Sequence, residues 1–455
     1  MLPRRSASAD LRFFESRVGT HLFVADGSRI YDLADELAQR ARPLLAEATA
    51  EELWQEFGLG QTVRRWIDET VPDLPAPSAI SLNVAQACNM ACGYCYADEG
   101  RFGGKSRLMK LSVARQSIDC LLEESAAGAT VLVGFMGGEP LLNRELIHEM
   151  APYATARAEA SGRKVRFSIT TNGTLLTPED AALFSHYPFS VQVSLDGDRK
   201  TNDAQRPMRD GSGSYEAILQ GVALMKMAGR PQQLTARVTV TRHTKNLRTS
   251  LEHLIELGFD EVGFAPVLVS PTEGVALQSE DFAEFLEQMI ECGRKCLTEL
   301  KAGRAFPFSN LLTALEEIHR GTHRPYPCGA GAAYLSANAE GKLYACHRLV
   351  DDPSFAMGDV ARGTDRVARR EHLERSHVDK MEPCRSCWAR YLCGGGCYHE
   401  VSRRGRVGCD YIRGWLEFCL GIYAELSAIS PEGLFFGKHQ RLPGLEEALP
   451  PLLLS

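Results

Sequence analysis

The sequence lacks any long apolar run, which excludes a membrane-spanning helix. None of its 455 residues lies in an uninterrupted apolar stretch of the roughly 18 residues that a span requires. Even the apolar segment from Leu416 to Ile429 contains Glu417 and Glu425. Internal repeats and low-complexity tracts are also missing, so nothing in the sequence indicates a solenoid or a disordered linker.

A signal-peptide core and a strong charge bias are absent as well. Arg4 and Arg5 are followed so closely by Asp10, Arg12 and Glu15 that no apolar signal core can form. The net charge of -7 is spread without long runs of one sign, so bulk electrostatics favours neither nucleic acid nor an anionic membrane as a partner. We expect a cytoplasmic protein that binds no nucleic acid and no membrane.

Cysteine is plentiful. The chain has 14 cysteines, and a reducing cytosol makes a metal framework a better explanation for them than disulfides. Three fall between residues 88 and 95, and seven fall between 328 and 409. The other four, which stand on apparently helical segments, are Cys120, Cys292, Cys296 and Cys419. We read these four as ordinary buried residues.

The length predicts two or three domains, and changes in apolar periodicity suggest their limits. Residues 1–75 read as a small α+β unit, with a hairpin over 11–33 followed by helical periodicity from Asp35 to Thr70. A proline-rich linker, Val71 to Pro77, closes this unit. We place the second domain at 76–302. After about residue 303 the β/α alternation fails and Gly, Pro and Cys become frequent, so 303–455 reads as a cysteine-rich third domain. It has only short predicted strands, such as Lys342 to Ala345, and a C-terminal helix that buries Cys419.

Residues 76–302 alternate between short β-rich runs and longer amphipathic segments. The amphipathic segments predict helices near 112–126, 143–161, 178–185, 214–228, 247–257 and 280–301. The six predicted strands are Ile80–Ala85, Thr130–Phe135, Val165–Thr170, Phe189–Leu195, Leu234–Val240 and Glu261–Val267. Six β/α units in series require parallel pairing with right-handed crossovers. The sequence therefore predicts an α/β fold with a partial (β/α)6 TIM-type barrel. A doubly wound open sheet is the alternative.

The first cysteine group directly follows the first predicted strand. Its residues, Cys88, Cys92 and Cys95, form a CxxxCxxC loop at the carboxyl end of that strand, where β/α barrels carry their active sites. Three thiolates can bind three irons of a four-iron cube and leave the fourth iron open. A zinc site or chance clustering is the competing explanation, but zinc normally takes four ligands.

At these residues the sequence resembles the radical S-adenosylmethionine (SAM) superfamily, whose motif has an aromatic residue before the last cysteine, here Tyr94. The resemblance implies a SAM-binding 4Fe-4S cluster that forms a 5'-deoxyadenosyl radical. It also implies an electron donor of the flavodoxin or ferredoxin type. The chemistry would belong to the cofactor, and the protein would orient the reactants and keep water out.

The resemblance continues at the ends of the later strands. It implies that Gly137, Gly138 and Glu139 bind the methionine amino group, and that Asn172, Ser194 and Arg206 contact the ribose and the carboxylate of SAM. Asn and Ser suit hydroxyl groups, and Arg offers a fork for a carboxylate. Each motif taken alone also fits a β-turn, and for the segment Asp196-Gly197 we favour the turn.

The second cysteine group resembles the SPASM domain of radical enzymes that modify peptides, which binds two auxiliary 4Fe-4S clusters. By this resemblance, Cys328, Cys346 and Cys397 hold one cluster. The other would be held by Cys384, Cys387, Cys393 and Cys409. With only three thiolates, the first cluster could have an open iron that binds a substrate cysteine. Paired zinc sites are the alternative, and Cys419 competes with Cys409 as the last ligand.

Two residues are candidates for a catalytic base. His347 stands directly after Cys346, where some relatives have an acidic base, and Asp410 stands directly after Cys409. For both, hydrogen bonding to a cluster ligand is an equally good explanation.

The presumed substrate also follows from resemblance. The N-terminal unit is similar in outline to a leader-peptide recognition domain, although a winged-helix or scaffolding role competes. Residues 80–425 resemble the maturase of the quinohaemoprotein amine dehydrogenase small (gamma) subunit, on the cues CGGGCYHE at 393–400 and CDYIRGW at 409–415. That family joins cysteine sulfur to a methylene carbon of Asp or Glu, which implies a small cysteine- and acid-rich protein or peptide as the substrate.

Two alternatives remain open. Another radical maturase, such as a sactipeptide, carbon-carbon cross-linking or sulfatase-maturing enzyme, would use the same clusters on a different peptide. From another class, the chain could be an iron-sulfur electron-transfer or scaffold protein, which should lack the SAM contacts.

Overall fold

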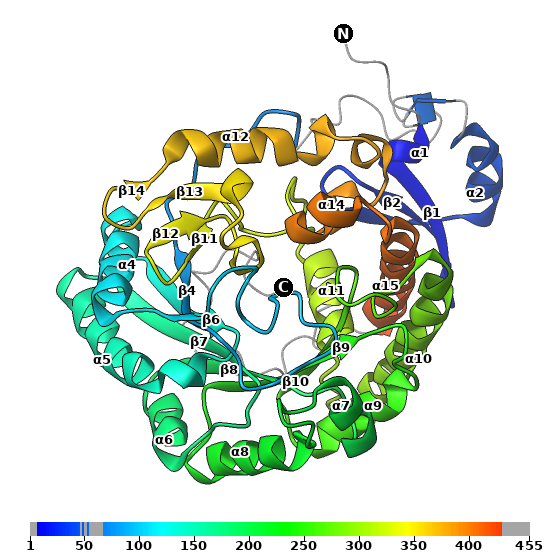
Figure 1. Cartoon of the computed structure of the whole chain (residues 1–455). Coiled ribbons are helices and arrows are strands. Elements are labelled where there is room, and N and C mark those ends of the chain that lie inside the picture. The colour runs from blue at the N-terminus through cyan, green and yellow to red at the C-terminus, as the bar shows by residue number, and fades with distance from the viewer. Residues whose placement is uncertain (1–6, 46–47, 50–51, 54–66, 430–455) are drawn as a thin grey trace. The chain divides into compact units, whose positions relative to one another are not determined.

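The computed structural model describes residues 7–45, 48–49, 52–53 and 67–429 (Figure 1). These residues form two compact units. The first comprises the described residues of Met1–Pro72, Phe282–Cys328 and Leu373–Leu445, and the second comprises Asp73–Asp281 and Gly329–His372. In the described residues, no helix is long and apolar enough to span a membrane.

A parallel sheet forms the centre of the second unit. Its strands are β4 (Ala79–Gln86), β6 (Thr130–Gly137), β7 (Lys164–Thr171), β8 (Phe189–Ser194), β9 (Gln233–Val240) and β10 (Glu261–Pro266). Each pairs in parallel with the next in chain order. Buried side chains pack between neighbouring strands; for example, the rings of Phe167 and Phe189 stack with their centroids 4.9 Å apart. All six predicted strands are therefore present.

The strand order decides between the two predicted topologies. A doubly wound sheet reverses its strand order at a switch point, whereas here the order from β4 to β10 is sequential. Among the described strands β10 pairs only with β9, so the sheet is open rather than closed. The α/β prediction is confirmed.

Helices cover the outer side of this sheet (Figure 1). They are α4 (Leu111–Glu124), α5 (Arg144–Ala160), α6 (Pro178–His186), α7 (Arg199–Gln205), α8 (Tyr215–Met227) and α9 (Leu247–Glu256). In α9 the buried residues Leu247, Ser250, Leu251 and Leu254 recur at helical spacing, which places one apolar face toward the strands. The predicted helices of this region are present, and α7 is an addition.

The sheet continues into the region where we predicted that the β/α alternation fails. Strand β11 (Tyr334–Ala337) pairs in parallel with β4, and β12 (Lys342–Tyr344), β13 (Ala356–Asp359) and β14 (Gly363–Thr364) follow in antiparallel order. A two-residue strand, β5 (Arg107–Leu108), pairs with the end of β4. Of these, the sequence predicted only the strand that contains β12.

In the first unit, the predicted N-terminal hairpin is a three-stranded meander. After a short helix, α1 (Ala7–Asp10), the strands β1 (Leu11–Ser16), β2 (Gly19–Val24) and β3 (Arg29–Leu33) pair antiparallel, and α2 (Asp35–Ala41) follows. Alternate strand residues join Ala38 and Ala41 of α2 in a small apolar core. Residues 54–66 of the predicted helical stretch lie outside the described residues.

Long helices complete the first unit. They are α10 (Phe282–Lys301), α11 (Ser309–His319) and α15 (Cys409–Ile429). Two short helices, α13 (Arg390–Cys393) and α14 (Tyr398–Arg404), also belong to this unit. Helix α12 spans Arg366–Ser376. Close packing joins α10 to α15, because a Cβ on Gly293 would lie 2.4 Å from the ring of Phe418. The predicted C-terminal helix is present, whereas α11 was not predicted.

Candidate functional site

The loop after β4 brings three thiols into one neighbourhood of the second unit. Burial is the main cause that raises the pKa of the Cys88 thiol to about 12, and Cys92 and Cys95 are near enough to add to the shift. Backbone bonds from Ala91 to Pro207 (3.0 Å) and from Gly93 to Gln205 (3.2 Å) fix the loop. The three predicted cysteines thus lie near one another on one loop.

Two glycines of the GGEP motif pack against the start of this loop. The N–H of Gly138 donates to the carbonyl of Ala85, and that of Glu139 to Ala87, both at 2.8 Å. A Cβ on Gly137 would lie 2.2 Å from the Ala85 oxygen, and one on Gly138 would lie 2.3 Å from the Ala87 oxygen. Only glycine permits this approach, so these residues have a packing role in addition to the predicted ligand contact.

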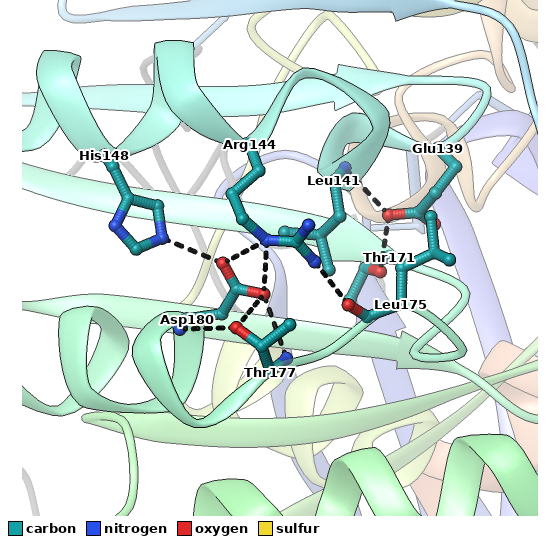
Figure 2. Close-up of polar contacts among 8 residues, drawn as sticks. All are labelled: Glu139, Leu141, Arg144, His148, Thr171, Leu175, Thr177 and Asp180. Carbon is teal, nitrogen blue, oxygen red and sulfur yellow. Dashed lines mark hydrogen bonds and ion pairs between the residues drawn. The ribbon is translucent and has the colours of Figure 1, made fainter.

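Glu139 is a fully buried carboxylate at the end of β6 (Figure 2). Its Oε1 accepts from the N–H of Leu141 (3.0 Å) and from the hydroxyl of Thr171 (2.7 Å), and its Oε2 accepts from the N–H of Asn172 (2.7 Å). Burial raises its pKa, and these hydrogen bonds partly offset the effect. Because a carboxylate oxygen accepts two bonds, Oε2 has one acceptor position left for a ligand ammonium.

Asn172 connects this carboxylate to the cysteine loop. Its side-chain amide donates to Asn89 Oδ1 (2.9 Å) and lies 3.9 Å from Cys88 Sγ. Asn89 in turn donates to Thr174 (2.9 Å), whose hydroxyl donates to Asn172 Oδ1 (2.7 Å). The predicted SAM-contacting residue Asn172 therefore also positions the segment that carries Cys88.

A polar clamp holds the loop between Asn172 and α6 (Figure 2). Arg144 Nε donates to both oxygens of the fully buried Asp180 at 3.0 Å, and His148 Nε2 lies 2.8 Å from Asp180 Oδ1. Asp180 also forms a capping box with Thr177 at the start of α6. Since Arg144 Nη2 donates to the carbonyl of Leu175, the clamp ties this loop to the helix that follows GGEP.

Arg206 lies beside the cysteine loop in a buried group with Tyr94 and Asp196. Arg206 Nη1 donates to the Tyr94 hydroxyl, which donates to Asp196 Oδ2 (2.8 Å). Burial raises the pKa of Cys92, and the Arg206 charge partly offsets that shift. Within the described residues, the buried Arg206 Nε has no hydrogen-bond partner. A buried donor without a partner is costly, so this atom suits an anionic ligand such as a carboxylate.

Asp196 is a functional candidate that our sequence reading assigned to a turn. It is fully buried, and its second oxygen accepts from the N–H of Thr239 at 2.8 Å. Its carboxylate complements the Arg206 charge, whereas a turn aspartate would normally face water. The SLDG motif at the end of β8 was the available signal. Ser194, the last residue of β8, is partly exposed and pairs in register with Arg237.

Four thiols of the second cysteine group lie near one another in the first unit. Burial raises the pKa of Cys393 to about 11, and Cys384, Cys387 and Cys409 are near enough to add to the shift. Two arginines that we did not predict face these thiols: Arg406 Nε donates to Cys384 Sγ at 3.1 Å, and Arg413 hydrogen-bonds Cys387. Positive donors of this kind stabilise thiolates.

The remaining predicted residues of the second group have different surroundings. Cys419 is fully buried within α15, where burial alone raises its pKa well above the usual value. Cys328 and Cys397 both lie near Tyr398 in the first unit, and Cys346 belongs to the second unit, with its Sγ 3.8 Å from His347 Nδ1. Asp410 has a 96% exposed side chain that pairs with Arg413. In the part of the chain that the structure describes, no three His, Cys, Asp or Glu side chains are grouped as ligands of a metal ion.

A known protein family matches the segment that carries the candidate site on β4 to β10. Residues 82–262 match the Radical SAM superfamily. The radical SAM match contains the cysteine loop, the GGEP motif, Asn172, Asp196 and Arg206.

Similar proteins extend beyond this segment. The chain is 26% identical over 356 residues to a serine-type anaerobic sulfatase-maturating enzyme of Klebsiella aerogenes, covering 73% of this chain and 83% of that protein. It is 26% identical over 350 residues to a mycofactocin maturase of Mycolicibacterium smegmatis, covering 74% and 82%. The solved structure described as native anSMEcpe with bound AdoMet and Cp18Cys peptide shares the fold, with a TM-score of 0.65 and 18% identity over 78% of this chain and all (100%) of that one.

Proposed function

We propose that this protein is a radical SAM enzyme that modifies a peptide or small protein by joining cysteine sulfur to a methylene carbon of Asp or Glu. One observation carries the proposal of radical chemistry. The thiols of Cys88, Cys92 and Cys95 lie near one another, and near Glu139 and Arg206, in the segment that matches the radical SAM superfamily. A mere electron-transfer protein has no need for a buried carboxylate and guanidinium beside its cluster.

The residues of this site suit the implied cofactors. When bound to the three thiolates, a 4Fe-4S cluster and SAM supply a 5'-deoxyadenosyl radical. Glu139 Oε2 would accept from the ammonium group of SAM, and the unpartnered Arg206 Nε would donate to its carboxylate. Tyr94 and Asp196 hold the Arg206 guanidinium in place. The asparagine bridge from Asn172 to Asn89 fixes the loop that begins at Cys88.

A peptide substrate is supported by the relatives. Two of the similar proteins are named as maturases, and the solved structure contains a bound peptide. In the proposed enzyme the residues of the N-terminal unit recognise this peptide by strand addition at β3, an edge strand of its described sheet.

The thioether step rests on the resemblance to the quinohaemoprotein amine dehydrogenase maturase and on the second cysteine group. The four thiols around Cys393 and the donors Arg406 and Arg413 suit one auxiliary cluster. Cys328, Cys346 and Cys397 would hold the other. The cross-link forms a carbon-sulfur bond. The 5'-deoxyadenosyl radical would take a hydrogen atom from the acceptor carbon, a base would take the thiol proton, and an auxiliary cluster would accept the remaining electron, so the product is two hydrogens lighter. In this proposal His347, whose Nδ1 lies 3.8 Å from Cys346 Sγ, receives the proton of the substrate thiol.

A second candidate is favoured by the sulfatase-maturating relatives. Such an enzyme would oxidise one residue of its substrate and leave the substrate's other thiols unchanged. Both reactions use the same radical site, so only the product separates them.

The first experiment tests the class of enzyme. The protein is reconstituted anaerobically with iron and sulfide, reduced with dithionite in the presence of SAM, and assayed for 5'-deoxyadenosine. We expect nucleoside formation that is lost in C88A/C92A/C95A. A fully reconstituted protein that forms none would contradict radical chemistry.

The second experiment tests the product. A small cysteine- and acid-rich protein encoded beside this gene is co-expressed, alkylated with iodoacetamide, and measured by mass spectrometry. A thioether predicts a loss of two hydrogens together with one alkylation site fewer per cross-link. An oxidised product with every thiol still alkylated would favour the second candidate.

A further inference from the structure

Two arginines of the first unit contact thiols of the second cysteine group. Arg406 Nε donates to Cys384 Sγ at 3.1 Å, and its Nη2 lies 3.0 Å from Met381 Sδ. Arg413 donates a hydrogen bond to the thiol of Cys387. Two of the four neighbouring thiols therefore each accept a hydrogen bond from a guanidinium.

The other two thiols, those of Cys393 and Cys409, lie near positive groups of a different kind. The backbone N–H of Gly395, whose φ is 97°, donates to Cys393. Cys409 is the first residue of the 21-residue helix α15, whose N-terminal end carries partial positive charge. Burial disfavours the Cys409 thiolate, and the charges of Arg413 and Arg406 partly offset this effect. All four thiols thus have a neighbour that stabilises negative charge on sulfur.

Two carboxylates lie near this positive charge, and both are exposed. Glu382 is near Cys384, and Asp410, whose side chain is 96% exposed, pairs with Arg413. Water screens exposed charges, whereas the hydrogen bond from Arg406 to Cys384 is partly buried and is screened less. The arginine charges therefore act on the four thiols more strongly than these carboxylates do.

The first cysteine group has more negative surroundings. The fully buried carboxylate of Glu139 lies near Cys88, and that of Asp196 lies near Cys92. Arg206 supplies one positive charge near Cys92. Net charge and hydrogen bonds to sulfur set the reduction potential of an iron-sulfur cluster. The two cysteine groups should therefore hold clusters of different potential.

We propose that Arg406 and Arg413 raise the reduction potential of the 4Fe-4S cluster held by the four thiols, and that this cluster accepts the electron which the substrate releases. The inference deepens the proposed function and rests on it. When the carbon-sulfur bond forms, the acceptor carbon gives a hydrogen atom to the 5'-deoxyadenosyl radical and the thiol gives its proton to a base. One electron is left over, and positive charge beside a cluster favours its reduction by that electron. Both arginines are positioning residues, because they act through the thiolates.

A redox titration of the reconstituted full-length protein tests this proposal without SAM or substrate. In the C88A/C92A/C95A background, the electron paramagnetic resonance signal that disappears on adding C384A belongs to this cluster. R406M removes both the charge and the donor. At a fixed potential the ratio of reduced to oxidised cluster should then fall about tenfold, as for the loss of one charge-assisted hydrogen bond, which is about 59 mV for one electron. R406K keeps the charge and should shift less, and R413M should shift in the same direction as R406M.

R320M is the matched control. Arg320 is an exposed arginine of the same unit that pairs with Glu316, so its loss should leave the potential unchanged. Iron content should equal that of the parent protein in R406M, R413M and R320M. The proposal is overturned if R406M and R413M keep the parent potential or if R320M shifts as far as R406M. Loss of four irons from R406M would also overturn it, because Arg406 would then hold the cluster rather than tune it.

The acceptor role has a readout of its own. Enzyme with its first cysteine group intact is given SAM, dithionite and the unmodified small cysteine- and acid-rich protein, and both products are counted. R406M should form fewer cross-links per 5'-deoxyadenosine than wild type or R320M. An unchanged ratio in R406M, despite a lowered potential, would overturn the acceptor assignment. Failure of the proposed function would appear separately, as the absence of 5'-deoxyadenosine or of cross-links from wild type.

Discussion

The carboxylate of Glu139 accepts a hydrogen bond from the backbone N–H of Asn172, with 2.7 Å between Oε2 and the nitrogen. This bond joins the ends of two neighbouring parallel strands, β6 and β7, directly behind the loop of Cys88. Because Glu139 is fully buried, the bond is not exchanged for one to water. The ligand-facing loops of the proposed radical site are therefore coupled through one side chain.

Replacement of Glu139 by glutamine should weaken this coupling. In E139Q an amide N–H₂ takes the place of one acceptor oxygen, so one of the three donors around it is left without an acceptor. We expect the free energy of unfolding to fall by about 1–3 kcal/mol and the affinity for SAM to fall about tenfold, with iron content retained. Denaturant melts and equilibrium dialysis of SAM measure the two effects. E145Q, on the exposed side of α5, is the matched control, and equal SAM affinity in E139Q and E145Q would contradict the assignment.

Arg206 should contribute to SAM binding through the geometry of its guanidinium N–H groups as well as through its charge. R206K keeps a cation beside Cys92 but has no equivalent of the buried Nε, so the carboxylate of SAM loses a partner. We expect the KM for SAM in 5'-deoxyadenosine formation to rise about tenfold, as for the loss of one charge-assisted bond. R199K, an exposed arginine paired with Glu216, is the control. An unchanged KM in R206K would show that Arg206 only supports Tyr94 and Asp196.

Alternating strands and cysteine spacing could be predicted because local sequence determines them. Leu234 to Val240, for example, was predicted within one residue of β9, whose buried residues alternate strictly. Strand β11 was missed because Ser336 interrupts the apolar pattern of its four residues, although it is buried in the fold, where Ser81 Oγ donates to its Oγ at 2.9 Å. Helix α11 buries Leu311, Leu315 and Ile318 at helical spacing, but we gave more weight to the local rise in Gly, Pro and Cys.

Of the candidate site, only the residues that stand in recognisable motifs could be predicted from the sequence. The three cysteines and Glu139 stand in recognisable motifs, whereas Asp196 looks like a turn residue until the fold buries it against Tyr94. The hydrogen bond from Arg406 to Cys384 joins residues of separate segments, one before α13 and one before α15. Such contacts follow from tertiary structure, which no local pattern reveals.

Because Cys384, Cys387, Cys393 and Cys409 lie near one another in the first unit and Cys419 lies apart from them, C384A and C419A should differ in iron content. C384A removes a thiol that faces Arg406 and lies near Cys387, Cys393 and Cys409, so reconstituted protein should contain about four fewer irons per chain. C419A removes a thiol buried alone within α15 and should retain the full complement. Iron and sulfide analysis measures both variants. Equal iron loss in C384A and C419A would contradict the ligand set that contains Cys409.

Asp180 should stabilise the radical site from outside it (Figure 2). In D180N an amide replaces the carboxylate that accepts from Arg144 and caps α6 at Thr177, and the guanidinium of Arg144 loses its ion pair. We expect the free energy of unfolding to fall by about 1–3 kcal/mol, because Asp180 is fully buried. Since Arg144 also holds the carbonyl of Leu175, the loop that begins at Asn172 should loosen and the KM for SAM should rise. E179Q changes the neighbouring exposed residue and should leave the KM for SAM unchanged. A destabilised D180N with the wild-type KM would limit Asp180 to a structural cap and would remove it from the positioning of SAM.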